Sequence, residues 1–165
     1  MEQQASFLAH LQLRLAPDPG LRHGISVSVT NAHPSMPVTI LKWNSPLDPA
    51  ALALGLVRVT PAGAAAPVDV RPVKISRAMP PSADALVTLL PGESATNSLD
   101  LSHPVVPGHI WDAGAARVRV AGRWMAVWPG LTKGDVLSDA GRLRSVGAGV
   151  GSLVGECESE YIEVR

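Results

Sequence analysis

The feature that most constrains the fold of this chain is an alternation of apolar and polar residues in short runs that end at proline or glycine. In residues 7–15 the odd-numbered positions are Phe, Ala or Leu, whereas His10, Gln12 and Arg14 fall on the opposite face. Because successive side chains of a strand point to opposite faces, this run predicts a half-buried strand. No part of the sequence keeps a helical period over three turns, so we expect strands almost throughout.

Runs of the same kind recur along the 165 residues, which fit one domain spanning residues 1–165. We expect strands at 7–15, 25–30, 38–43, 55–60, 66–70, 73–77, 85–90, 94–101, 115–121, 123–128 and 159–165. Residues 131–155 are rich in glycine and predict a long loop before the closing strand. Short strands at this spacing indicate an all-β, immunoglobulin-like antiparallel β-sandwich. Its core is expected to contain Ile25, Val27, Val29, Ile40, Val87 and Leu89.

The charge balance and the single cysteine limit which classes of binding partner and which cellular location we expect for this protein. Basic and acidic residues number 14 each and form no like-charged block, which argues against nucleic acid as a partner. No apolar stretch approaches the roughly 18–20 residues that span a bilayer, so no membrane role is expected. The first residues lack the features of a secretory signal, and the single Cys157 leaves no internal disulfide. These features together predict a cytoplasmic protein.

Several segments resemble a known family. They are the run from Ile25 to Asn31, the stretch Trp43-Asn-Ser-Pro-Leu-Asp48 and the Pro-Gly-Glu-Ser turn that ends at Ser94. They resemble the non-catalytic N-terminal, propeptide-like β-sandwich of fungal deuterolysin-type metalloendopeptidases, in a stand-alone form without the peptidase domain. The resemblance covers roughly residues 5–130 and implies inhibitor-like or chaperone-like binding to a protein partner. The chain has no His-Glu-x-x-His motif, so the zinc site of that peptidase is absent from the sequence.

No cofactor or metal ion is expected, since the sequence lacks the usual motifs. The five histidines never fall at the short spacings that place two zinc ligands on one element. A ligand set of His103, His109 and Asp112 would have to come from one loop, and surface histidines are the preferred interpretation. Cys157 lies between Glu156 and Glu158, whose negative charge raises the pKa of a thiol and makes it a weak nucleophile.

The aromatic residues are the strongest candidates for a ligand site. Four of the six are tryptophans, and Trp124 and Trp128 are expected on one face of a strand. A place in the core is favoured for most of them, because each ring buries a large area. Trp111 lies in a connection flanked by proline and glycine, where a contact or lid role is favoured. The candidate ligand-binding residues are Trp43, Arg77, Trp111, Arg123, Trp124 and Trp128.

Two functions remain open at this point. The first is a non-catalytic intracellular binding module that recognises a protein partner through its loops or an edge strand. The alternative is a small cofactor-free enzyme, an isomerase or cyclase of fungal specialised metabolism, which holds a hydrophobic small molecule in a tryptophan-lined pocket. Arg77 or Arg123 would then stabilise a developing oxyanion. Assembly into a homo-oligomer through an exposed strand edge is a third possibility.

Overall fold

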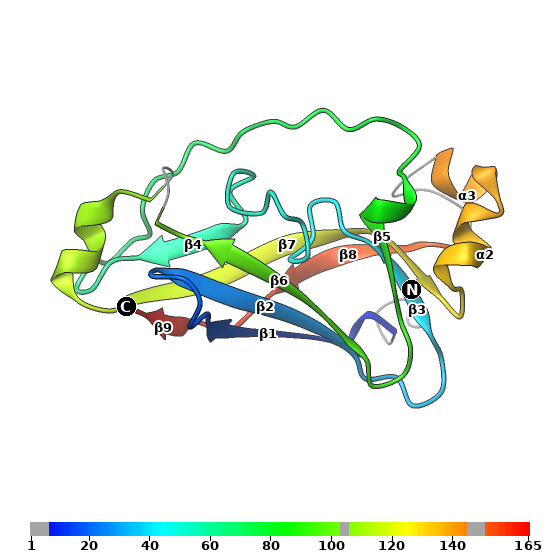
Figure 1. The fold of residues 1–165 in the computed structure, drawn as a ribbon, viewed down its shortest axis with the longest axis horizontal. Coiled ribbons are helices and arrows are strands. Elements are labelled where there is room, and N and C mark those ends of the chain that lie inside the picture. The colour runs from blue at the N-terminus through cyan, green and yellow to red at the C-terminus, as the bar shows by residue number, and fades with distance from the viewer. Residues whose placement is uncertain (1–6, 103–105, 145–150) are drawn as a thin grey trace.

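The computed structural model describes residues 7–102, 106–144 and 151–165, whose strands form two antiparallel sheets (Figure 1). The smaller sheet has the order β1-β2-β6, with bounds β1 Leu11–Pro17, β2 Gly24–Asn31 and β6 Ser94–Asp100. The larger sheet has the order β4-β7-β3-β5, with β8 and β9 also paired to β7. Its bounds are β3 Val38–Leu41, β4 Val57–Thr60, β5 Leu86–Leu89, β7 Ala116–Pro129, β8 Leu153–Glu158 and β9 Ile162–Val164. The predicted immunoglobulin-like β-sandwich is confirmed.

Strand β7 is the central element of the larger sheet. Its first half pairs with β4 and β9, and its second half pairs with β3 and β8. The sequence predicted two strands that break near Gly122, yet the structure has one strand of 14 residues. The strand continues because Ala121 donates to the Leu56 carbonyl and Arg123 donates to the Asn44 carbonyl, both at 2.8 Å. These two bonds bridge the space between β4 and β3.

A β-bulge in β7 changes the direction of its side chains. Trp124 lies opposite Gly155 and Val127 lies opposite Leu153. Between these two pairs, β7 therefore contains one residue more than β8. Trp124 and Val127 therefore share one hydrophobic cluster, whereas Trp128 belongs to another. The expectation that Trp124 and Trp128 face the same side was wrong, because strict alternation does not pass through a bulge.

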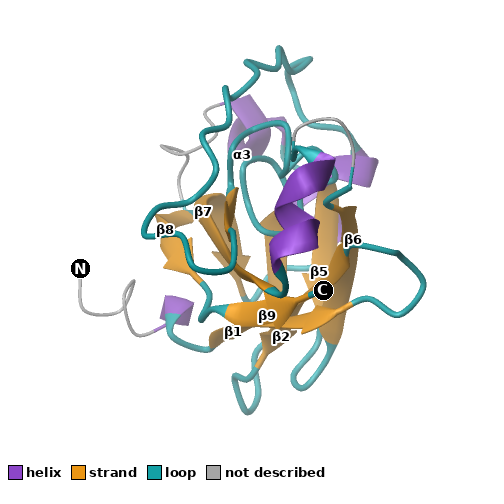
Figure 2. Ribbon diagram, turned by 90° about the vertical axis from the view of Figure 1, so that its left-hand side faces the viewer, coloured by secondary structure: helices purple, strands orange, loops and turns teal. Residues whose placement is uncertain are grey.

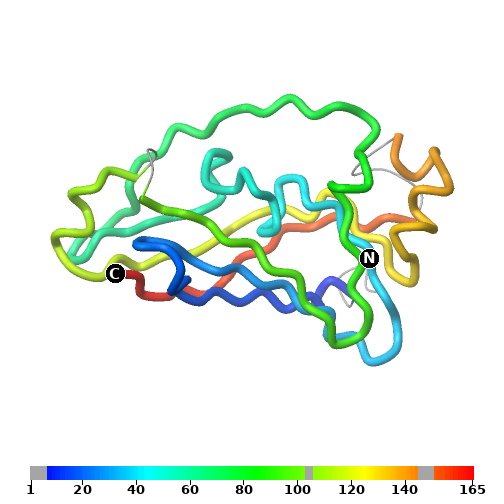
Figure 3. The backbone as a smooth tube through the Cα atoms, in the orientation of Figure 1, coloured from blue at the N-terminus to red at the C-terminus, as the bar shows by residue number. Residues whose placement is uncertain are grey.

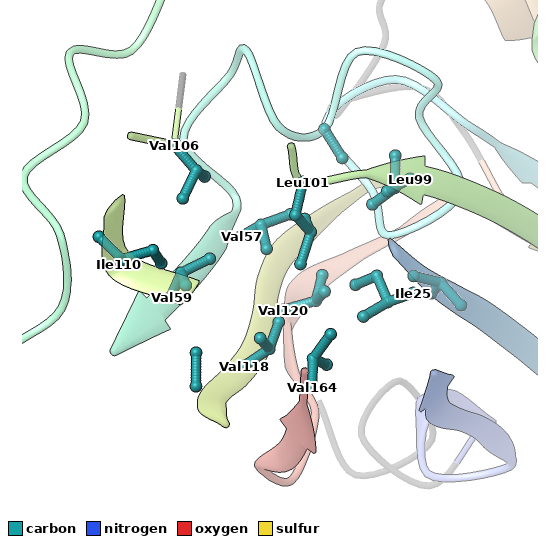
Figure 4. Close-up of a cluster of buried hydrophobic side chains, with 13 residues drawn as sticks. Ile25, Val57, Val59, Leu99, Leu101, Val106, Ile110, Val118, Val120 and Val164 are labelled. Atoms are coloured by element: carbon teal, nitrogen blue, oxygen red, sulfur yellow. The ribbon is translucent and has the colours of Figure 1, made fainter. Parts of the chain in front are cut away.

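The space between the sheets is filled by aliphatic side chains. The first cluster gathers residues from β2, β4, β6, β7 and β9 around Val118 and Val120 (Figure 4). Of the predicted core residues, Val87 is half-buried and packs against the second cluster. The other five are buried: Ile25, Val27, Val29, Ile40 and Leu89. The period-two pattern therefore identified the core face correctly.

Further parts of the chain differ from the predicted elements: residues 7–10, predicted as the start of the first strand, form a helical turn ahead of β1, and two later parts differ as well. The ranges 66–70 and 73–77 form no strand. In the predicted long loop at 131–155, residues Lys133–Leu137 form α2, residues Ala140–Arg144 form α3, and β8 already begins before the loop would end. Each helix is too short to show a period in the sequence. Residues 145–150 of that range lie outside the described residues.

A capping box at the start of α2 and one buried side chain on each helix account for the two short helices. The Thr132 hydroxyl accepts from the Asp135 N–H at 3.2 Å, and the Asp135 carboxylate accepts from the Thr132 N–H at 2.9 Å. This capping box satisfies two donors at the start of α2. Val136 of α2 and Leu143 of α3 are buried in the cluster that contains Trp128. The two helices therefore cover one end of the sandwich.

Replacement of Gly122 by alanine is expected to destabilise the fold. A Cβ at Gly122 would lie 3.0 Å from the Asn44 carbonyl oxygen and 3.2 Å from the Pro46 Cδ, so the backbone of that turn would have to move. We expect Gly122→Ala to lower the free energy of unfolding by about 1–3 kcal/mol, the range of overpacked sites. Denaturant melts measure the change. Gly108→Ala is the control, because nothing lies within 4 Å of its Cβ position; equal losses in both variants would contradict the argument.

Candidate functional site

The four tryptophans are distributed over three hydrophobic clusters and do not line a common pocket. Trp124 is 2% exposed in the second cluster, and Trp128 is fully buried in the third. Trp43 packs on the outside of the third cluster and Trp111 on the outside of the first. Trp128 therefore acts as a core residue, Trp124 is buried too but borders a surface groove described below, and the structure does not bring the six predicted site residues together.

Trp111 lies on η2 (Gly108–Ala113), where it stacks on His23. The two rings are parallel to within 1° and their centroids are 4.3 Å apart. Trp111 also packs against the first cluster beside the buried Ile110. The partly buried ring also lines an open hollow of about 410 Å³ together with His23 and Asp112, so the contact or lid role expected for Trp111 stays a prediction beside this packing role. His103, the other end of that connection, lies outside the described residues.

Arg77 is bound to a buried carboxylate. Its guanidinium lies 2.5 Å from the carboxylate of Asp48, whose side chain is 1% exposed, and 5.4 Å from the ring centroid of Trp43. Asp48 also accepts the N–H of Asn44 at 2.8 Å and that of Ala50 at 2.9 Å. The carboxylate therefore ties together a turn and a distant segment. The structure brings Trp43 and Arg77 together, but around an ion pair and not around a cavity.

Arg123 is exposed beside an open hollow of about 700 Å³ on the larger sheet. Arg58 and Arg123 lie in its wall together with Glu156 and Glu158, so the wall carries both signs of charge. None of the tryptophans lines it. Leu54 and Leu56 give it some apolar surface, but without a tryptophan in its wall this hollow is not the predicted tryptophan-lined pocket.

A second concave site is a groove along β1. It consists of two adjoining hollows of about 540 and 440 Å³, which share Ala9, Leu11 and Leu13. The opposite wall comes from β8 and the connection to β9, and β9 lies next to β1 at the end shown in Figure 2. We call this site the β1 groove. Its apolar floor includes Leu11, Leu13, Leu15, Trp124 and Ile162.

The backbone of β1 faces this groove with one edge. The His10 carbonyl accepts from the Ala32 N–H at 2.8 Å, and the Asp18 N–H donates to the Gly24 carbonyl at 3.0 Å. Even-numbered residues of β1 therefore direct their backbone groups toward β2, because the direction alternates in an antiparallel pair. The odd-numbered leucines direct theirs away from β2. Within the described residues, β2 is the only strand that pairs with β1.

The rim of the β1 groove is acidic and carries one exposed aromatic ring. Glu156, Glu158 and Glu160 lie along it, and only Glu158 forms an ion pair within the described residues, with Arg119 at 3.0 Å. Tyr161 is 46% exposed, and the Arg119 guanidinium lies 4.4 Å from its ring centroid. The basic Arg14 lines the groove from β1. The predicted site missed these residues, although the alternation of glutamates from 156 to 160 is visible in the sequence.

Cys157 lies on the groove wall and its thiol is weakly acidic. Burial raises the pKa of Cys157 to about 12, the negative charge of Glu156 adds to the increase, and a backbone hydrogen bond from Gly122 opposes it. The expected rise in pKa is found, but burial and not the neighbouring glutamates is its main cause. Among residues 7–102, 106–144 and 151–165, no group of three or more potential metal ligands comes together. No helix in these ranges is long and apolar enough to cross a membrane.

Comparison with known proteins shows the family of this chain. A family model described as an immunoglobulin-like domain matches residues 10–165. The chain belongs to the immunoglobulin-like domain family. An uncharacterized secreted protein from Arthroderma benhamiae is similar to this immunoglobulin-like domain, with 35% identity over 109 residues. The matched region is 63% of this chain and 52% of the relative, so the domain spans about half the length of that curated relative.

These comparisons correct one expectation and leave another without support. The relative is named as a secreted protein, which contradicts the predicted cytoplasmic location of this immunoglobulin-like domain. The inference failed because it rested on the first residues of the chain and on a single cysteine. The match to the immunoglobulin-like family does not extend to the deuterolysin propeptide, so that part of the resemblance stays a hypothesis.

The ion pair between Arg77 and Asp48 is expected to stabilise this immunoglobulin-like domain. Asp48→Ala leaves the Arg77 side chain and two backbone N–H groups without their acceptor, and we expect a loss of about 3 kcal/mol in the free energy of unfolding. Arg77→Met keeps the apolar stem over Trp43 but leaves the buried Asp48 carboxylate with only its two backbone N–H donors, so we expect a loss of about 2 kcal/mol. Denaturant melts compare both with Arg142→Met, which breaks a 3.9 Å surface pair with Asp139 and a 2.7 Å hydrogen bond to the Asp135 carbonyl. A loss in Asp48→Ala no larger than in this control would contradict the assignment.

Cys157 is expected to react slowly in the folded protein. Because its folded pKa is raised to about 12, thiolate is scarce at pH 8 and grows only as the pH approaches that value. We expect iodoacetamide to alkylate the native protein at least tenfold more slowly at pH 8 than the protein unfolded in denaturant. Mass spectrometry follows the reaction, with Cys157→Ser as the unlabelled control. A native rate that levels off near pH 9 would show that the thiol is not perturbed.

Proposed function

We propose that this protein is a non-catalytic binding module that receives an extended segment of a protein partner along the β1 groove. The observation that carries the proposal is the outer edge of β1, where Leu11, Leu13 and Leu15 direct backbone donors and acceptors into an open groove. An extended peptide can add to such an edge as a further strand. Its backbone would bond to these residues, and its side chains would alternate between the apolar floor and solvent.

The composition of the groove supports a protein ligand more than a small molecule. The floor is apolar, the rim carries glutamates, and the partly exposed Tyr161 offers an aromatic contact of the kind enriched at interfaces. The cofactor-free isomerase or cyclase finds no specific observation in its favour. Its four tryptophans are spread over three clusters, and Arg77, one of its proposed oxyanion donors, is bound to Asp48.

Two further aspects belong to the proposal. The protein acts outside the cell, as the name of its relative suggests for that protein. The bound segment belongs to a protein whose activity or folding the module controls, in the inhibitor-like or chaperone-like manner that the deuterolysin resemblance implies. Both aspects follow from similarity, and the strand-addition mode stands independently of them.

Removal of one outward N–H from β1 tests the proposal. Leu15→Pro deletes the N–H that faces the groove and keeps every bond to β2, since proline is tolerated on the free side of an edge strand. Leu15→Ala is the matched control, because it also loses the leucine side chain but keeps the N–H. The probe is a labelled peptide of alternating valine and lysine, acetyl-VKVKVKV-amide. We expect its affinity to fall at least tenfold further in the proline variant than in the alanine variant.

Amide exchange gives a second measurement of the same interaction. In the parent protein the N–H groups of Leu11, Leu13 and Leu15 should exchange faster than those of Gln12 and Arg14, which bond to β2. The peptide should slow exchange at the three leucines. Equal peptide affinity in the two Leu15 variants, with no change in exchange along β1, would refute strand addition at this edge.

A further inference from the structure

The segment of residues 71–77, which we call the arm, is unexplained by the fold and by the proposed function. The sequence predicts a strand at 73–77, because Val73 and Ile75 alternate with Lys74 and Ser76. In the structure the arm belongs to neither sheet. Val73 is 56% exposed and Ile75 is 38% exposed. The arm therefore has the composition of a strand without a strand partner.

The arm is anchored to the body of the molecule at two points. Near its start, the Val73 N–H donates to the Ala53 carbonyl at 2.8 Å. At its end, Arg77 is bound to the buried carboxylate of Asp48 and lies over the ring of Trp43. Residues 71–76, which include Val73 and precede Arg77, are all exposed. A second molecule can therefore reach the arm without breaking either anchor.

The charge of the arm complements the rim of the β1 groove. Residues 70–83 contain no acidic residue, and of their three basic residues Arg71 and Lys74 are available to a second molecule, since Arg77 is paired with Asp48. The groove presents Glu156 and Glu160 beside an apolar floor, while Glu158 is paired with Arg119 and the basic Arg14 lies on the β1 side. Strand-forming apolar residues with basic neighbours match a site that offers backbone groups, apolar contact and negative charge.

The two features lie on opposite sides of one molecule. The arm runs along the top of the views in Figures 1 and 3, whereas β1 lies along the bottom with both sheets between them. An arm that stays anchored to Ala53 and Asp48 cannot reach the groove of its own chain. The complementary contact is possible only between copies, with the arm of one molecule in the groove of the next.

We propose that the occupant of the β1 groove is the arm of a second copy of this chain, an inference that rests on the proposed strand addition. The contact joins two different surfaces, so it is heterologous and extends into a ring or an open chain. A strand of this length buries less area than a stable dimer needs, so the association is weak and concentration-dependent. Because charges of opposite sign meet at the rim, added salt weakens it.

A peptide made from the arm separates this inference from the proposed function. The labelled probe is residues 70–78, VRPVKISRA, and a scrambled peptide of the same composition is its control. We expect the arm peptide to bind at least tenfold more tightly than the scrambled peptide and to lose affinity when salt rises from about 50 to 500 mM. It should slow amide exchange at Leu11, Leu13 and Leu15. If the valine and lysine peptide binds but the arm peptide does not, the inference fails and strand addition stands; if neither binds, both fail.

Self-association of the whole protein tests the contact in its own context. Sedimentation velocity over rising concentration should show a mass increase in the parent that Leu15→Pro abolishes. A double change in the arm, Val73→Ser with Ile75→Ser, should abolish it too, since it removes the apolar contacts while the anchors at Ala53 and Asp48 remain. Leu90→Ser is the matched control, because Leu90 is an apolar residue 48% exposed outside the arm and the groove. A parent that stays monomeric, or an assembly that the arm variant leaves intact, would overturn the inference.

Discussion

The backbone pairing of β7 is the constraint on which the rest of this structure depends. Both edges of the strand are occupied, by β4 and β3 on one side and by β9 and β8 on the other. Gly122 at its midpoint lets the turn at Asn44 approach closely enough to accept a hydrogen bond from Arg123. The same turn also positions Asp48, whose carboxylate binds Arg77. The position of the arm is thus set by a strand with which it has no direct pairing.

The alternation of apolar and polar residues predicted those features of the fold that depend on neighbouring residues in the sequence. Ile25, Val27 and Val29 alternate regularly and are all fully buried, because β2 has a partner on each side and no irregularity. The bulge after Trp124 was not predictable, since it depends on the register between β7 and a strand that begins at Leu153. The helices at 133–137 and 140–144 depend on a capping box and on two buried side chains, and neither produces a period.

The candidate site was less accessible to prediction than the core. Tryptophan attracts attention in a chain with few aromatic residues, but large rings are also what a core needs, and Trp124 and Trp128 lie there. The β1 groove arises because residues 9–15 and 156–162 come together from the two ends of the sequence. The sequence predicted a closing strand at 159–165, which includes Glu160 and Tyr161. It did not indicate which strand would lie opposite.

The exposed arm also has a consequence for the covalent continuity of the chain. Lys74, which is followed by Ile75, is a site that a trypsin-like protease recognises, and it is exposed, whereas Pro72 protects the bond after Arg71. Cleavage there would sever the link between β4 and β5, yet β4 remains paired to β7 and β5 to β3. The two fragments would remain one folded body that separates only on denaturation. The same position would accept new termini in a circularly permuted chain, because the sheets hold together on both sides of the break.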